Sequence, residues 1–226
     1  KVFRVLLGAS IMTIQKGYIG LKLLESDRAI QRAIYESLVE EINGAIKRNK
    51  QNTIRTLKRS VATWVGAQPE ISSLLSKGGF GSLRAQFGLP SIRAEEAVRE
   101  IVSSVSESLQ IRITPVNTKF KGQIEFNFQP ITFLNLLGLH DGHIMTERGQ
   151  NLHWLDWLLT KGDMTIVTGY AYTPGNAGRS GGGVMNLGGV WRVPPEFSGT
   201  VSNNFITRSF IGREKEITTT LQGLLK

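Results

Sequence analysis

Two histidines and a carboxylate lie close together in the second half of the sequence, in the run His140-Asp141-Gly142-His143. Asn151 and His153 follow a short way along the chain. Imidazoles and carboxylates bind divalent metal ions and act as general bases on water. These residue types raise the hypothesis of metal-dependent hydrolysis, which requires a complete set of ligands.

The order of these residues is similar to the beginning of an HNH nuclease motif, in which a histidine activates water and an asparagine orients it. That motif needs a further histidine or asparagine on a helix about two turns later. The chain has Leu-Leu-Thr at 158–160, and His153 is too close to Asn151 for this role. We therefore interpret 140–143 as a polar turn and predict no catalytic, metal-binding or cofactor-binding residue. A cryptic metal-dependent nuclease is the second alternative function.

A glycine-rich segment at 178–189 is the other candidate for chemistry, because such loops can surround phosphate groups. A nucleotide-binding loop needs a strand before it, a helix after it and, in the Walker type, a lysine next to Ser or Thr. This segment has no lysine and lies between two expected strands. We predict instead a flexible hairpin loop over 173–189, with its centre at Gly178, Arg179, Gly181, Gly182 and Gly183.

Basic residues are concentrated in the first third of the chain. Residues 1–66 contain 12 of the 27 Lys and Arg but five of the 18 Asp and Glu, so they carry +7 of the net charge of +9. The basic cluster, as we call it, consists of Lys47, Arg48, Lys50, Arg55, Lys58 and Arg59. Its members form either a solvated helix face or a contact with phosphate groups or an acidic subunit.

Aromatic residues are not interleaved with the basic cluster, since Trp64 alone lies near it. Stacking on exposed bases is therefore not indicated. A contact with nucleic acid would reach the backbone and would not depend on base sequence. A basic domain that binds the nucleic-acid backbone, with non-specific contact to DNA, is the first alternative function.

The first half of the chain has the apolar spacing of helices. A four-residue spacing predicts one helix, and a second follows a polar break at 47–52. Its cap is expected at Asn52 or Thr53, and Gly66 and Pro69 should end it. A third helix is expected from Ser91 to residue 109. The apolar positions of the first pair are Ile30, Ile34, Leu38, Ile42 and Ile46, then Ile54, Leu57, Val61 and Trp64.

After residue 110 the apolar period changes to two, which predicts strands at 111–114 and 124–128. Short helices are expected at 131–138 and 151–160, strands at 164–172 and 190–193, and a C-terminal helix from Asn203 or Asn204. Strands without regular helical crossovers predict an α+β fold with an antiparallel sheet. We expect a helical arm over 1–75 and an α+β core over 76–226, or one continuous domain.

Composition excludes several other classes. The chain has no cysteine, so disulfides, thiolate metal sites and cysteine nucleophiles are excluded. No uncharged apolar run of about 18 residues occurs, and we expect no contact with a membrane.

The last third of the chain resembles a known family. The pattern consists of Trp154-Leu-Asp-Trp-Leu-Leu-Thr-Lys-Gly162, a strand and loop, Trp191-Arg-Val-Pro-Pro-Glu-Phe-Ser-Gly-Thr200, and Asn204-Phe-Ile-Thr-Arg-Ser-Phe210 before a last helix. It is similar to the minor tail and tail-completion proteins of tailed bacteriophages, which sit at the neck, or connector, between head and tail. The likeness extends loosely over 28–226.

The resemblance implies a non-enzymatic structural subunit of a virion that is assembled in the host cytoplasm. It implies a ring-like homo-oligomer that also contacts neighbouring virion proteins, and it brings no catalytic residues. Long loops of this family reach neighbouring subunits. On this basis the glycine-rich loop and the basic cluster are expected to lie at subunit contacts.

Overall fold

The computed structural model describes residues 3–7, 10–15, 18–23, 25–128, 133–145, 149 and 151–225. Helices alternate with strands that form small antiparallel sheets, which confirms the α+β fold class. The chain divides into two compact units. The first contains Lys1–Asn49, Ile113–Ile124 and Leu224–Lys226, and the second contains Lys50–Arg112 and Glu125–Gly223. These units do not coincide with the expected ranges 1–75 and 76–226.

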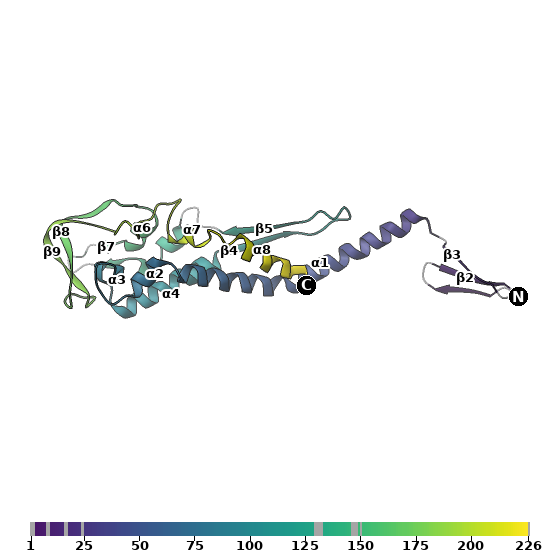
Figure 1. Cartoon of the computed structure of the whole chain (residues 1–226), viewed down its shortest axis with the longest axis horizontal. Helices are drawn as coiled ribbons and strands as arrows, with labels where there is room; N and C mark the ends of the chain where they lie inside the picture. Colours follow the sequence, from purple (N-terminus) through teal and green to yellow (C-terminus); the bar gives the residue numbers. More distant parts are fainter. Residues whose placement is uncertain are drawn as a thin grey trace. The chain divides into compact units, whose positions relative to one another are not determined.

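Helix α1 (Asp27–Gly66) is continuous, so the prediction of a helical pair with a break at 47–52 was wrong (Figure 1). The polar run contains no proline or glycine, and Lys, Arg and Gln are good helix formers. Its polarity therefore marks an exposed part of the helix and not an end. The expected end was correct, because α1 stops at Gly66 and α2 (Pro69–Leu75) begins with proline.

Three strands precede α1, in a region that the sequence analysis assigned to the helical arm. β1 (Phe3–Leu7), β2 (Ser10–Gln15) and β3 (Tyr18–Leu23) form an antiparallel sheet in that order. The assignment to a helical arm is corrected here. Short runs rich in apolar residues, with Gly8 or Gly17 between them, favour hairpins over a helix.

The hairpin of β4 (Leu109–Thr114) and β5 (Gln123–Phe128) confirms the two expected strands. Within the first unit, Asn43 of α1 holds the residues that follow β4. Its Nδ2 donates to the Val116 carbonyl at 2.9 Å, and its Oδ1 accepts from the Val116 amide at 2.9 Å. A Cβ at Gly122 would lie 2.9 Å from the Val116 side chain, so the hairpin needs glycine there. The first unit therefore depends on a polar clamp between helix and hairpin.

The core of the second unit collects side chains from many short elements. They include Val61, Trp64 and Val65 of α1, and the aromatic rings of Phe87, Trp154 and Trp191. Its further elements are α3 (Leu83–Gln86), α4 (Ser91–Glu107), α5 (Leu134–Leu137), the short helix η1 (His140–Gly142), β6 (Ile144–Met145), β7 (Asn151–Leu152) and α6 (Trp154–Leu159). The helices expected at 91–109, 131–138 and 151–160 are thus present in shortened form. Residues 131 and 132 lie outside the described residues.

Strands β8 (Thr165–Pro174) and β9 (Gly183–Arg192) form a hairpin of ten-residue strands (Figure 1). The expected loop over 173–189 was too long, since the link covers 175–182. The reason is a bulge: Thr168 pairs with Val190 but Tyr170 pairs with Leu187. Gly188 and Gly189, with φ of +102° and +82°, lie opposite the single residue Gly169, so β9 has one extra residue there and neither glycine belongs to a loop.

The C-terminal segment forms two helices, α7 (Phe205–Ser209) and α8 (Glu214–Gln222), followed by η2 (Gly223–Leu225). A single helix was expected, but the chain turns at Gly212, which has φ of +75°. The N-cap was expected at Asn203 or Asn204, and it is Asn204. Its buried side chain accepts from the Ile206 and Thr207 amides at 3.1 Å and donates to the Thr200 carbonyl at 2.8 Å.

We expect Asn204→Ala to lower the free energy of unfolding by about 2 to 3 kcal/mol, because the cap is lost and the carbonyl of the buried Leu159 loses its donor. Asn204→Asp keeps the acceptor atoms but lacks the amide donor, so it separates the two roles. Urea unfolding followed by circular dichroism measures both variants. An Asn204→Ala variant as stable as the native chain would contradict this role for the cap.

Candidate functional site

The basic cluster lies entirely on α1, but its members differ in their surroundings. Lys47 and Arg48 belong to the first unit and are exposed. In the second unit, Lys58 forms an ion pair with Glu107 and is therefore partly neutralised. Arg55 and Arg59 are exposed one helical turn apart, and no ion pair to either occurs among the described residues. Lys50 also belongs to the second unit but is half-buried, so Arg55 and Arg59 are the members of the cluster in that unit whose side chains are exposed.

An apolar groove of about 610 Å³ lies in the first unit, between α1 and the β4–β5 hairpin. Leu38 and Phe120 line it with 42% and 45% of their surface exposed, although both are large apolar side chains. Ile34, one turn before Leu38, is 51% exposed and lines an adjoining hollow. The other apolar side chains of the groove are Ile42, Ala45, Ile46, Ile113, Val116, Ile124 and Leu225.

Sequence reasoning missed this groove. The stripe on α1 was expected to pack against a second helix, and that helix is the continuation of α1 itself. The stripe alone indicates a face that needs burial, but it does not tell which element covers it. We call the exposed apolar side chains Ile34, Tyr35, Leu38, Phe120, Ile124 and Leu225 the first-unit patch.

All three histidines of the chain gather in the second unit. The ring centre of His143 is 4.9 Å from that of His153 and 6.3 Å from that of His140. Asn151 Nδ2 lies 3.5 Å from His143 Nδ1. Within the described ranges, however, no group of three His, Asp or Glu side chains is placed to hold a metal ion.

The carboxylate beside the histidines has a structural role. Asp141 is buried, and its Oδ1 lies 2.6 Å from Arg93 of α4. Its backbone carbonyl accepts a hydrogen bond from Trp154 Nε1 at 3.0 Å. Burial, followed by the charges of His153, His140 and Arg93, lowers the pKa of His143, while Asp141 opposes this change. The geometry is therefore that of a proton-sensitive surface cluster.

The glycine-rich link between β8 and β9 contacts α3 and β6 of its own chain. Arg179 Nε donates to the Gly88 carbonyl at 3.0 Å, and its Nη1 donates to the Met145 carbonyl at 3.1 Å. A Cβ at Gly182 would lie 2.6 Å from that of Ala85, so a close backbone approach requires this glycine. Contact of Gly178, Arg179, Gly181, Gly182 and Gly183 with a neighbouring subunit stays a prediction.

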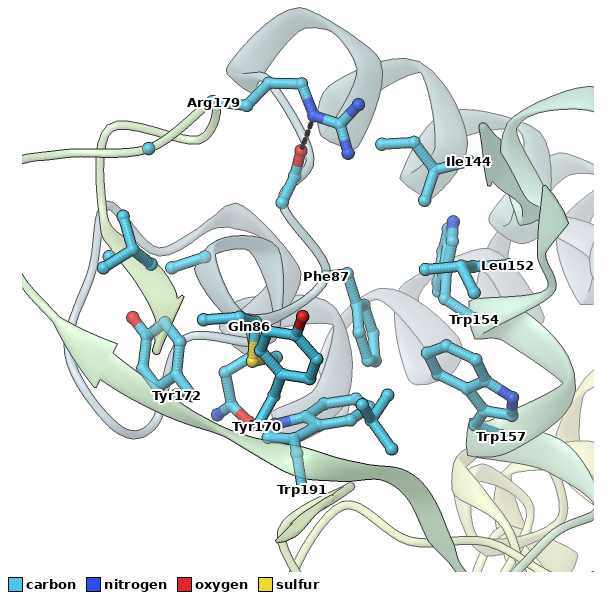
Figure 2. Close-up of a pocket in the computed structure, with 17 residues that line it drawn as sticks. Gln86, Phe87, Ile144, Leu152, Trp154, Trp157, Tyr170, Tyr172, Arg179 and Trp191 are labelled. Carbon is cyan, nitrogen blue, oxygen red and sulfur yellow. Dashed lines mark hydrogen bonds between the residues drawn. The ribbon is translucent and has the colours of Figure 1, made fainter. Parts of the chain in front are cut away.

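A pocket of about 570 Å³ lies beneath this link (Figure 2). Its rings are Phe87, Trp154, Trp157, Tyr170, Tyr172 and Trp191. Phe87 stacks on Trp154 with ring centres 5.4 Å apart, and Trp191 Nε1 donates to Gln86 Oε1 at 2.9 Å. Figure 2 shows Arg179 at one end of the pocket and Trp157 and Trp191 at the other. The pocket therefore combines an aromatic floor with a cationic rim.

Comparisons with protein families, with curated proteins and with solved structures find no match to this chain. Among the described residues, no helix has both the length and the hydropathy needed to cross a membrane.

The histidine cluster predicts a pH dependence of stability. Because the pKa of His143 in the folded chain is below the usual 6.5, the unfolded chain takes up this proton first as the pH falls. The stabilisation is complete above pH 6.5 and is lost as the pH falls through the folded-state pKa. We expect the melting temperature of His143→Gln to fall less between pH 7.5 and about pH 5 than that of the native chain. Equal losses in both proteins would contradict the prediction.

Proposed function

We propose that the chain is a non-enzymatic structural subunit that assembles with copies of itself through its first unit. The observation that carries this proposal is the first-unit patch, whose side chains are 37% to 58% exposed. Four of them line the groove, Ile34 lines the adjoining hollow, and the ring of Tyr35 packs edge-on against that of Phe120. Contiguous apolar surface on a water-soluble protein marks sites of protein contact. Covering it with another subunit would remove the cost of its hydration, about 25 cal/mol for each Å².

The geometry of the first unit suits assembly better than binding of a small molecule. The groove is formed by a helix face and a hairpin, held together by the Asn43 clamp on Val116. Glu41, Arg48, Thr114 and Gln123 also line the groove, but most of its lining side chains are apolar, which favours an apolar occupant over a polar substrate. An extended apolar segment or helix of another subunit fits these properties.

The resemblance of the last third to tail-completion proteins supplies a setting for this assembly. In that setting the chain is part of a ring at the neck or connector of a bacteriophage virion and also touches neighbouring virion proteins. The basic cluster would then face an acidic subunit. This setting rests on the pattern of 154–210 and is proposed together with the assembly.

The alternative function is binding to the nucleic-acid backbone, and one observation favours it. Arg55 and Arg59 are exposed on one face of α1 in the second unit, without an ion pair among the described residues. Such groups bind phosphates without reading the bases. Lys58 is less suited, because Glu107 already neutralises it.

Sedimentation velocity of Leu38→Glu tests the assembly. We expect the native chain to associate and the variant to associate at least about tenfold more weakly, because a carboxylate would be buried in the interface. The control is Ala29→Glu, which changes the charge equally. Ala29 is exposed about 140° around α1 from Ile34, so this variant should associate normally. Equal association of the native chain and Leu38→Glu would contradict the role of the patch, and a native chain that stays monomeric would contradict self-assembly.

A second experiment distinguishes binding to the nucleic-acid backbone from contact with an acidic subunit. If Arg55 and Arg59 bind phosphates, Arg55→Glu combined with Arg59→Glu should abolish DNA binding. Replacing both by Gln should reduce the slope of log affinity against log salt by about 1.8, which corresponds to two phosphate contacts. If the residues face an acidic subunit, both pairs of substitutions should leave DNA binding unchanged and weaken assembly. Fluorescence anisotropy with a labelled duplex over a range of salt concentrations makes the measurement.

A further inference from the structure

The pocket beneath the β8–β9 hairpin is a second place where the chain could bind another molecule. It lies wholly within the second unit, and its volume of about 570 Å³ is within the range of small-molecule sites. Trp154 and Trp191 are buried at its floor, while Arg179 and Met185 are exposed at its mouth. A ligand could therefore enter from solvent and reach the rings.

Arg179 is held in position but is not neutralised. Its Nε and Nη1 donate to the carbonyls of Gly88 and Met145, which fix the plane of the guanidinium group. No ion pair to Arg179 occurs in the part of the chain that the structure describes. Nη2, for which no hydrogen bond is formed among these residues, can donate to an anion without breaking either contact.

The rings opposite Arg179 favour a flat apolar body. Phe87 contacts Trp157 and Trp191 with ring centres 5.8 and 5.9 Å away, so the floor is closely packed. The Tyr170 hydroxyl points toward the middle of the pocket, where it can donate a second hydrogen bond (Figure 2). The side chain of Gln86 already forms hydrogen bonds with Trp191 and the Phe80 carbonyl. The Tyr172 hydroxyl likewise lies in hydrogen-bond distance of the Gly79 and Gly182 carbonyls.

We propose that this pocket binds a carboxylate attached to an aromatic or branched apolar group, with the carboxylate on Arg179 Nη2 and the Tyr170 hydroxyl and the apolar group on the tryptophan floor. Such a ligand is either a free small carboxylate or the C-terminus of a polypeptide that ends in an apolar residue. The site does not depend on the proposed assembly, because the groove of that assembly belongs to the first unit.

Tryptophan fluorescence reports on the site directly, because three of the four tryptophans of the chain line the pocket. The probes are 3-phenylpropionate, its neutral analogue 3-phenylpropanol, and the peptide Gly-Gly-Phe with a free or an amidated C-terminus. We expect 3-phenylpropionate to bind with a dissociation constant on the order of 1 mM and the alcohol to bind about tenfold more weakly. Tighter binding of the free peptide than of 3-phenylpropionate would assign the site to a polypeptide end, and the reverse order to a small carboxylate.

Arg179→Gln tests the assignment of the anion. It should weaken binding of the carboxylate about tenfold and leave binding of the alcohol unchanged. Arg55→Gln, at an exposed arginine far from the pocket in sequence, is the matched control and should bind like the native chain. Tyr170→Phe keeps the ring and should weaken carboxylate binding about threefold, which tests the site even where Arg179→Gln fails to fold.

Two results would overturn the proposal. One is equal affinity for the carboxylate and the alcohol in the native chain. The other is the absence of any fluorescence change up to about 20 mM 3-phenylpropionate. Binding weaker than that would show that the rings and Arg179 form no site. Neither result would affect the sedimentation of the native chain and of Leu38→Glu, so failure here is distinguishable from failure of the proposed assembly.

Discussion

The packing of Phe87 against the tryptophans of the second unit holds its elements together. Phe87 follows α3 and contacts Trp154 and Trp157 of α6 and Trp191 of β9, with ring centres 5.4 to 5.9 Å apart. Aromatic pairs at these distances contribute about 0.5 to 1.5 kcal/mol each beyond their buried area. The hydrogen bond from Trp191 to Gln86 joins residues 105 positions apart in the sequence. The pocket is lined by these rings, Arg179 donates to the carbonyl of Gly88 next to Phe87, and Trp154 donates to the carbonyl of Asp141 beside the histidines.

Local signals made several elements predictable from the sequence. The cap at Asn204 and the end of α1 at Gly66 each depend on a few adjacent residues, so the sequence narrowed the cap to Asn203 or Asn204 and located the helix end at Gly66. The alternation at 111–114 and 124–128 likewise identified β4 and β5. The polar run at 47–52 was misleading, since polarity is equally compatible with an exposed helix surface and with a break. The glycines at 188 and 189 were misread for a similar reason, because a bulge and a loop use the same residue.

The candidate sites were harder to predict because they depend on long-range contacts. The sequence placed His140, His143 and His153 near one another, but not with their rings in contact, and it did not show that Asp141 pairs with Arg93. The clamp between Asn43 and Val116 joins residues 73 positions apart and has no local signature. Arg179 was identified only as part of a flexible link, although it is held by two carbonyls. The groove, the histidine cluster and the pocket are formed by such long-range contacts and not by residue types that a sequence pattern would single out.

Covering of the first-unit patch by another copy of the chain is the central claim of this account. Photo-crosslinking from position 34, with p-benzoylphenylalanine in place of Ile34, tests it most directly. Chain that carries p-benzoylphenylalanine at natural isotope abundance is mixed with ¹⁵N-labelled chain that lacks it. After irradiation, the cross-linked peptides are identified by mass spectrometry. The account predicts cross-linked peptide pairs of mixed isotope composition, which arise only between copies. Cross-links found solely within one copy, at concentrations where the chain associates, would contradict it.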